Sequence, residues 1–224
     1  VYFMYVAKKD GFEVDQKMVD RANSFLQSIL RRKDEDIWNY PYRRNAQLCT
    51  KAFIVYVLSL WDVPDPGYIT RLYNERFQIP IFGRAMLLKA IHYSNMSSIM
   101  EEEMVRDIFN SIKQDPTRAH FEEQDPTGLD WIFDSSVRTS AYILQAMLET
   151  GHEFPQAAKV IRWLMDERKN GRWRSTQENL YVFHAFTEYF KRYEKEEPKF
   201  VATIKLGGRE ALRHLFEGRT VQAH

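Results

Sequence analysis

Apolar residues recur with helical spacing along most of the chain, and residues 170–190 (NGRWRSTQENLYVFHAFTEYF) show this pattern most clearly. The segment begins with the turn pair Asn170-Gly171, and Ser175, Thr176 and Glu178 follow with the spacing of a capping box. Apolar residues then repeat at intervals typical of an amphipathic helix. We expect a helix whose wide apolar stripe faces inward, made of Leu180, Tyr181, Phe183, Ala185, Phe186, Tyr189 and Phe190.

The rest of the chain up to about residue 195 repeats this unit of turn, cap and helix. We expect helices at 1–9, 15–33, 45–61, 68–76, 81–93, 100–113, 135–149 and 155–169, with a long loop at 114–134. Asp15 would cap the second helix, whose buried face would include Met18 and Phe25. Ser135 or Ser136 would begin the helix at 135–149, and Gly151 would end it. The segment 45–61 is apolar almost all round, which indicates a buried helix. Helical pairs recur about every forty residues, and this period predicts either a solenoid or a closed α/α toroid of about nine helices.

The pattern changes after the acidic residues 194–197. Residues 199–206 (KFVATIKL) alternate between polar and apolar, as in a half-buried strand, and Gly207-Gly208 follows as a turn. Residues 209–218 fit either a second strand or a short helix. We therefore expect a helical domain over 1–195 and the start of a β domain over 198–224.

Composition excludes few classes of protein. The formal net charge is +1, and no basic face indicates nucleic-acid binding. No apolar run has the length of a membrane span, and a single cysteine, Cys49, excludes an internal disulfide. The chain begins in what resembles the middle of a helix, so we expect a piece of a longer protein whose helical domain is incomplete at its N-terminus.

Two patterns could bind a metal ion. His184 and Glu188 lie one helical turn apart, as a zinc-binding pair would, but the neighbours of His184 are apolar and we favour a structural histidine. The acidic run Glu101–Glu103 lacks the alternating spacing and the glycine of a calcium loop, so we interpret it as a solvated helix face. We expect no metal ion and no cofactor.

Several carboxylates and tryptophans could serve a carbohydrate-active enzyme, since glycosidases work with two carboxylates across a cleft. The candidate carboxylates are Asp130, Asp134 and Glu149, or Glu122 and Glu123. The tryptophans near predicted loops, Trp38, Trp131 and Trp173, could stack on sugar rings or could equally anchor loops to the core.

The remaining nucleophiles have structural interpretations. Cys49 lies at the start of a buried helix, where a cap at Asn45 would place it near the helix N-terminus and could lower its pKa. We nevertheless favour a packing role for this thiol. Ser175 and Thr176 precede a helix and are interpreted as caps, not as catalytic hydroxyls.

Four segments resemble, in the same order, the thioester domain of bacterial alpha-2-macroglobulins. They are AFIVYVLSLWD (52–62), YNERFQIPIFGRAMLLKAI (73–91), SSVRTSAYILQAMLE (135–149) and RWRSTQENLYVFHAFTEYF (172–190). The last contains the family pattern of a tryptophan, a Ser-Thr pair, a Glu-Asn pair and a helix that ends in aromatic residues, here Trp173 to Tyr189. The resemblance covers most of residues 1–195.

The resemblance implies a large protease-trapping protein, periplasmic or at the cell envelope and often lipid-anchored, whose thioester domain is an α/α toroid. Many members carry a reactive Cys-x-Glu-Gln motif, which this chain lacks. Thr50, Lys51 and Ala52 follow Cys49, and residues 121–124 read Phe-Glu-Glu-Gln, which we interpret as a chance match. The family motif would lie upstream of Val1. The helical domain could also self-associate through apolar surface that is left uncovered.

We therefore expect an all-α chain of α/α-toroid type with a short β segment at its C-terminus. It would be the scaffold of an alpha-2-macroglobulin-like inhibitor, with no catalytic residue of its own. Its expected partners are target proteases, bound by the complete protein, and neighbouring β domains. Two alternatives remain open: a carbohydrate-active α/α-toroid enzyme, which needs two carboxylates facing one cleft, and a helical-repeat interaction module, which needs an extended concave surface.

Overall fold

A computed structural model describes residues 1–32, 44–123, 135–193 and 199–217. In these ranges it contains nine α-helices, one 3₁₀-helix and two two-stranded sheets. The elements are α1 (Tyr2–Lys9), α2 (Gln16–Arg31), α4 (Arg44–Leu60), α5 (Pro66–Asn74), η2 (Arg76–Gln78), α6 (Ile81–Ser94), α7 (Ser98–Phe109), β1 (Ile112–Gln114), β2 (Ala119–Phe121), α9 (Ser136–Glu149), α10 (Ala157–Asp166), α11 (Thr176–Tyr193), β3 (Lys199–Leu206) and β4 (Arg209–Glu217).

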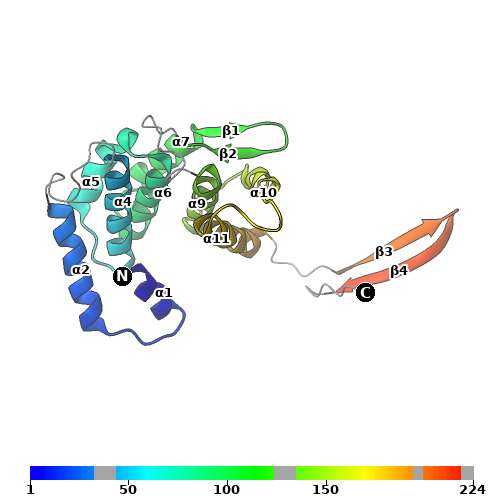
Figure 1. The fold of residues 1–224 in the computed structure, drawn as a ribbon, viewed down its shortest axis with the longest axis horizontal. Helices are drawn as coiled ribbons and strands as arrows, with labels where there is room; N and C mark the ends of the chain where they lie inside the picture. Colours follow the sequence, from blue (N-terminus) through cyan, green and yellow to red (C-terminus); the bar gives the residue numbers. More distant parts are fainter. Residues whose placement is uncertain (33–43, 124–134, 194–198, 218–224) are drawn as a thin grey trace.

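Helices α4, α6, α9 and α11, which we call the inner helices, pack on one another in this order (Figure 1). Near their amino ends, α4 and α6 approach each other closely at Gly83 of α6. A side chain larger than glycine would not fit there, because its Cβ atom would lie 2.9 Å from the Cys49 sulfur of α4. Toward the carboxyl ends, Lys89 of α6 pairs with Glu149, the last residue of α9. Paired helices of this kind confirm the predicted all-α class with α/α-toroid architecture.

The core lies between the inner helices. Residues 85–91 of α6 and residues 139–148 of α9 are buried without interruption, as expected of helices that are covered on several sides. Residues 52–60 of α4 are apolar almost throughout, and all but Phe53 are buried. The prediction that 45–61 is a buried helix is thus confirmed. No helix in the described ranges combines the length and the apolar character that a membrane span requires.

Side chains cap several helices where the sequence predicts them. Asp15 accepts a hydrogen bond from the Lys17 amide at the start of α2, and Ser135 accepts one from the Arg138 amide at the start of α9. Gly151 follows α9 with a φ of 78°, a left-handed conformation that favours glycine. Local sequence therefore determines these boundaries.

The region after α7 differs from the expectation. The helix ends at Phe109 instead of continuing to Lys113, and the hairpin β1–β2 takes up the end of the predicted helix and the start of the predicted loop. Asp115 forms its turn, because its carboxylate accepts hydrogen bonds from the amides of Thr117 and Arg118. Strand β2 then packs between α9 and α10, and Phe121 is fully buried. The turn chemistry makes a hairpin here, where the sequence pattern had indicated only a loop.

Helix α11 also differs from the expectation. Val182 and Ala185 are buried, but Leu180, Phe183 and Phe190 are exposed, although they were predicted to face inward. Helix α9 covers only part of the apolar stripe, so the remainder faces solvent. Two residues predicted to face inward from α2, Met18 and Phe25, are exposed for the same reason, since a single neighbour covers part of an apolar face.

Strands β3 and β4 form an antiparallel hairpin with Gly207 and Gly208 at its turn, both at positive φ. The structure therefore resolves the ambiguous segment after Gly208 as a strand. Phe200, Ile204 and Leu206 alternate with Val201, Thr203 and Lys205 along β3, so one face of the hairpin is more apolar than the other. These side chains are all exposed.

Candidate functional site

Two buried or partly buried carboxylates join the inner helices at their amino ends. Glu123 accepts hydrogen bonds from the first amides of α6, at 3.2 Å from the Ile81 nitrogen and 2.7 Å from the Phe82 nitrogen. It also accepts one from the Thr139 hydroxyl of α9 at 3.3 Å. The first amides of a helix lack partners within the helix, and its dipole favours an anion there. Glu123 thus caps α6 and holds it against α9.

Glu178 plays the corresponding part between α9 and α11. The Ser175 amide donates to the Glu178 carboxylate and the Glu178 amide donates to the Ser175 hydroxyl, both at 3.2 Å, which confirms the predicted capping box. The other Glu178 oxygen accepts a hydrogen bond from the Ser135 hydroxyl at 2.6 Å. Because Ser135 is the N-cap of α9, one buried carboxylate connects the starts of two helices.

An aromatic layer lies directly beneath these caps. The rings of Phe82, Tyr142 and Tyr181 are in mutual contact, with centroid distances of 4.9–5.8 Å. The Arg138 guanidinium lies 4.5 Å from the centroid of the Phe82 ring and donates to Gln177 of α11. Burial raises the pKa of the Tyr142 hydroxyl well above its ordinary value, and Tyr181 and Glu149 raise it further. Proton exchange by this hydroxyl near neutral pH is therefore unfavourable.

A buried ion pair occupies the carboxyl half of the same helices. The Lys89 amine, in a side chain only 1% exposed, lies 2.6 Å from the Glu149 carboxylate. The same amine lies 4.5 Å from the Tyr56 ring and 5.2 Å from the Tyr142 ring. Burial lowers the pKa of Lys89, and Glu149 opposes that effect. Glu149 thus neutralises the buried charge of Lys89, which would be strongly unfavourable in the core without a counter-ion.

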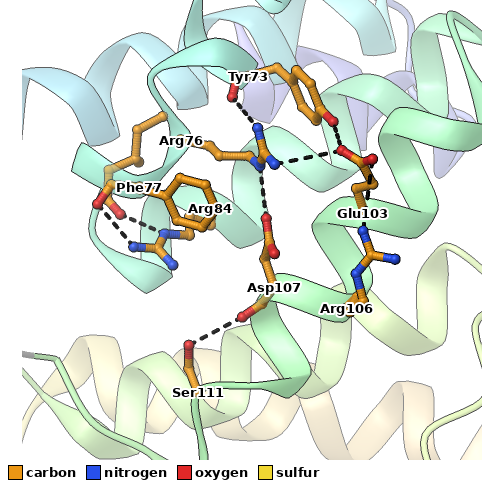
Figure 2. Close-up of polar contacts among 9 residues, drawn as sticks. Tyr73, Arg76, Phe77, Arg84, Glu103, Arg106, Asp107 and Ser111 are labelled. Atoms are coloured by element: carbon orange, nitrogen blue, oxygen red, sulfur yellow. Dashed lines mark hydrogen bonds and ion pairs between the residues drawn. The ribbon is translucent and has the colours of Figure 1, made fainter.

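A second polar cluster joins the outer elements (Figure 2). Arg76 of η2 donates to Asp107 of α7 at 2.7 Å and lies 3.5 Å from Glu103. The Tyr73 hydroxyl donates to Glu103, and the Arg76 guanidinium lies 4.3 Å from the centroid of the Tyr73 ring. The cluster fastens η2 and the end of α5 to α7.

The acidic run Glu101–Glu103 is not the solvated face that we expected. Only Glu102 is exposed. One Glu101 oxygen is 2.8 Å from Nδ1 of His92 and 2.9 Å from Nε2 of His152, while Glu103 belongs to the Arg76 cluster. His92, His152 and Arg76 come from other parts of the chain, so the sequence of the run alone could not identify them.

The predicted histidine–carboxylate pair is also arranged differently. His184 lies on the exposed face of α11. The apolar residues beside it in sequence, Phe183 and Phe186, are themselves exposed or only partly covered. Glu188 pairs with Lys191 at 2.7 Å. Within the described ranges, no three histidine, cysteine, aspartate or glutamate residues are grouped so that they could hold a metal ion.

Two of the candidate carboxylates of an enzyme, Glu123 and Glu149, lie at opposite ends of α9. Glu149 ends α9 and is bonded to Lys89, while Glu123 lies near the opposite end of the same helix. A helix of 14 residues is about 20 Å long, far more than the separation that paired carboxylates need. Glu122 is 2.9 Å from His120. Asp130 and Asp134 lie outside the described residues.

The remaining candidates have structural environments. Trp173 is buried and donates from its indole nitrogen to the Leu164 carbonyl at 2.7 Å, which makes it a loop anchor. Trp38 and Trp131 lie outside the described residues. Helix α4 begins at Arg44, so Asn45 lies in its first turn and is not its cap. Cys49 is partly buried against Gly83.

Sequence reasoning missed the Lys89–Glu149 pair and the bonds from Glu101 to His92 and His152. One signal was available for the first: Lys89 is the one charged residue in the apolar run 85–91, and a lysine inside a buried segment needs a partner. The histidines carried no such signal, since His152 is 51 residues from Glu101.

Comparisons with known proteins agree with this architecture. Residues 80–189 match the family model of the A-macroglobulin TED domain. An alpha-2-macroglobulin homolog of Nostoc sp. (strain PCC 7120) is 23% identical over 209 residues, which make up 92% of this chain and 10% of that protein. Circularly permutated Ras protein 2 of Dictyostelium discoideum is 34% identical over 68 residues, 30% of this chain and 2% of that protein. The chain thus spans a tenth or less of the length of these curated relatives.

Solved structures show the same fold. The native conformation of E. coli alpha-2-macroglobulin has a TM-score of 0.68 at 19% identity, covering 97% of this chain and 13% of that one. Salmonella alpha-2-macroglobulin reacted with methylamine has a TM-score of 0.65 at 21% identity, covering 95% of this chain and 13% of that one. The family model over residues 80–189, the relative from Nostoc and the shared fold agree with one another and support the identification of the chain as a fragment of the alpha-2-macroglobulin family.

Proposed function

We propose that this chain is the helical scaffold of an alpha-2-macroglobulin-like protein that traps proteases, and that it is not itself an enzyme. The match of residues 80–189 to the TED domain carries the proposal. The chain contains no Cys-x-Glu-Gln motif, so a reactive thioester would have to come from elsewhere in the complete protein.

The contacts of the described carboxylates support a scaffold role. Glu123 and Glu178 cap helices, Glu149 neutralises Lys89, and Glu103 and Asp107 hold Arg76. A general acid or base needs a proton that it can exchange with a substrate, whereas these groups are each bonded to the fold. Their arrangement favours a rigid frame over the carbohydrate-active alternative.

We assign residues 1–195 to the TED-type helical domain and residues 198–224 to the start of a following β domain. The hairpin β3–β4 supports this division. A two-stranded hairpin is marginally stable by itself, and this one has a more apolar face made in part by Phe200, Ile204 and Leu206. Further strands of a neighbouring domain would cover that face.

The partners and location follow from the same proposal. Target proteases would be bound by the complete protein, at the periplasm or cell envelope, and the neighbouring β domains would contact this scaffold. Leu180, Phe183 and Phe190 form an exposed stripe on α11 that would be covered by another part of the protein or by self-association.

The test uses the complete protein that contains this chain. After it is mixed with trypsin, we expect the protease to cleave a small chromogenic peptide but to lose activity on casein, because enclosure excludes large substrates. Equal loss or equal retention of both activities would contradict protease trapping. The intact mass with and without methylamine then separates the two mechanisms, since a thioester gains the mass of the amine and releases one thiol. An unchanged mass would indicate trapping by enclosure alone.

A further inference from the structure

Residues 169–172 form a two-residue hairpin turn between α10 and α11. The Lys169 amide donates to the Arg172 carbonyl at 3.0 Å, and the Arg172 amide donates to the Lys169 carbonyl at 3.1 Å. Asn170 and Gly171, at the tip of the turn, have φ values of 51° and 79°. Positive φ at both central residues is the requirement of a type I′ turn, for which Asn-Gly is a preferred pair. The sequence and the backbone conformation therefore agree at this turn.

The same pair is chemically reactive. The backbone nitrogen that follows an asparagine can attack the carbon of the side-chain amide, and glycine hinders this approach least because it has no Cβ atom. Asn170 is the only asparagine of the chain that precedes a glycine. Asn170 and Gly171 are both exposed, and neither the Asn170 side chain nor the Gly171 amide is hydrogen-bonded to another described residue. Both reacting groups are thus unrestrained by hydrogen bonds within the part of the chain that the structure describes.

Two other asparagines show what distinguishes Asn170. Asn95 also has a φ of 51°, but Met96 follows it, and the Cβ atom of Met96 hinders the attacking nitrogen. The Asn179 side chain accepts a hydrogen bond from the Trp173 amide at 3.3 Å and donates to the Trp173 carbonyl at 3.0 Å. Asn95 is therefore an internal control for the backbone conformation alone.

The charge around the turn favours the same reaction. The attacking species is the nitrogen anion that forms when the Gly171 N–H loses its proton, and positive charges nearby stabilise an anion. Four exposed basic residues lie within three positions of Gly171, namely Arg168, Lys169, Arg172 and Arg174. They also stabilise the carboxylate of the product.

We propose that Asn170 is a site of spontaneous modification, which converts it to isoaspartate. The Gly171 nitrogen loses its proton to solvent and forms a bond to the side-chain carbon of Asn170. The carbon–nitrogen bond of the side-chain amide breaks, and the nitrogen takes up a proton and leaves as ammonia, so that a succinimide ring remains. Water then opens the ring. Attack at the main-chain carbonyl gives isoaspartate, and attack at the side-chain carbonyl gives aspartate. The two steps consume one water and release one ammonia, with no oxidant or reductant.

The product changes the turn and the contacts beside it. Isoaspartate inserts one additional carbon atom into the backbone before Gly171, which a two-residue turn cannot accommodate with the hydrogen bonds between Lys169 and Arg172 intact. Trp173 follows directly, and its indole nitrogen donates to the Leu164 carbonyl of α10. The modification should therefore loosen the connection between α10 and α11. This inference does not depend on protease trapping.

The test is incubation of the full chain at mildly alkaline pH, followed by digestion with endoproteinase Glu-C in mildly acidic buffer and mass spectrometry. Cleavage after glutamate releases residues 168–178, which contain Asn170, and residues 76–101, which contain Asn95. The first peptide should gain the mass difference between an amide and an acid about tenfold faster than the second, which corresponds to about 1.4 kcal/mol in the barrier. Fragmentation by electron transfer should identify isoaspartate in the product. No mass gain in 168–178, equal rates in the two peptides, or a gain only in urea overturns the proposal.

Two variants separate the modification from its consequence. Asn170→Gly allows the positive φ but has no side-chain amide, so it should abolish the mass gain and keep the turn. Asn170→Asp has the charge of the product without the additional backbone atom. Hydrogen exchange at the Arg172 amide should become about tenfold faster in the isoaspartate form, because its bond to the Lys169 carbonyl is lost, and should be unchanged in freshly purified Asn170→Asp. Unchanged exchange in the isoaspartate form, or equal acceleration in Asn170→Asp, overturns the effect on the turn.

Discussion

The two ends of α9 hold carboxylates in opposite ways. At the amino end, Glu178 is bonded to the amide of Ser175 and to the hydroxyl of Ser135, and no basic side chain is among these partners. At the carboxyl end, Glu149 is bonded to the buried amine of Lys89. The same type of side chain is thus satisfied by polar groups of helix starts at one end and by a full positive charge at the other.

The helix dipole explains the difference. Amino ends carry partial positive charge and free amides, which stabilise an anion without a counter-ion, whereas a carboxylate at a carboxyl end faces partial negative charge. Glu149 therefore needs Lys89, and Lys89 needs Glu149 because its own charge is buried. The amino ends of the inner helices are thus held by capping side chains, whereas their carboxyl halves are held by one ion pair between residues far apart in the sequence.

The largest expected effect is alkaline unfolding, which acts on the half around Lys89. Burial raises the pKa of Tyr56 and Tyr142 above the ordinary value of 10.0. Their stabilising effect is complete below pH 10 and is lost as the pH rises above it, by about 1.4 kcal/mol per pH unit for each tyrosine, because only the unfolded chain releases these protons. Circular dichroism should show the helical signal falling above pH 10, together with a rise in absorbance at 295 nm beyond that from the exposed tyrosines.

Lys89 acts with the opposite sign but cannot cancel this loss. Its pKa is lowered by burial, so its contribution to stability increases with pH up to its ordinary value of 10.5 and is constant beyond. A helical signal that stays unchanged well above pH 10 would instead show that Tyr56 and Tyr142 do not resist ionisation in the folded chain.

The next effect tests the ion pair itself. Lys89→Met leaves the Glu149 carboxylate without its cation, and we expect a loss of about 3 kcal/mol in the free energy of unfolding, at the low end of the range for broken buried pairs because the Glu149 side chain is 20% exposed. Urea unfolding followed by circular dichroism measures it. The double variant Lys89→Met, Glu149→Gln should recover part of the loss, and the variant Lys17→Met, at an exposed position of α2, should change stability by less than about 0.5 kcal/mol.

At the amino end, Glu178→Ala removes the bonds to Ser175 and Ser135 together. We expect a loss of about 2 kcal/mol, the sum of a cap and a buried hydrogen bond. Glu178→Gln keeps the size of the side chain and an acceptor oxygen, so it should cost about half as much in the same urea measurement. Equal costs for the two variants would mean that the charge of the carboxylate, not its hydrogen-bond geometry, stabilises this end.

The contacts at the two ends of α9 differ in how well the sequence predicts them, and the reason is physical. The sequence predicts the caps at Asp15, Ser135 and Ser175 correctly. A capping side chain bonds to an amide two or three residues further along the chain, so a short stretch of sequence contains both partners. Lys89 and Glu149 lie on different helices, and only the packing of α6 against α9 brings them together. Local chemistry is readable from a sequence, whereas partners across helices are not.

Helix α11 shows a second limit. Its spacing correctly predicts a helix, but periodicity says which residues share a face and not how much of that face a neighbour covers. Val182 and Ala185 are buried, while Phe183 is exposed. The hairpin β1–β2 is a different case, because Asp115 and Pro116 between two short alternating segments are a turn signal that could have predicted it.

The smallest expected loss of stability concerns Glu101, a carboxylate that lies at a helix amino end and also contacts basic side chains. Glu101 lies in the first turn of α7, where the dipole favours an anion, and it also contacts His92 at the end of α6 and His152 just after α9. Glu101→Gln retains an acceptor but loses the charge, so we expect a loss of about 1 kcal/mol by urea unfolding at pH 7. The adjacent exposed variant Glu102→Gln is the matched control and should be nearly neutral. If Glu101→Gln and Glu102→Gln lost equal free energy of unfolding, the helix dipole, which acts on both residues, would contribute more than the contacts of Glu101 with the two histidines. The amino end of α7 would then be stabilised by its dipole, as the amino ends of the inner helices are.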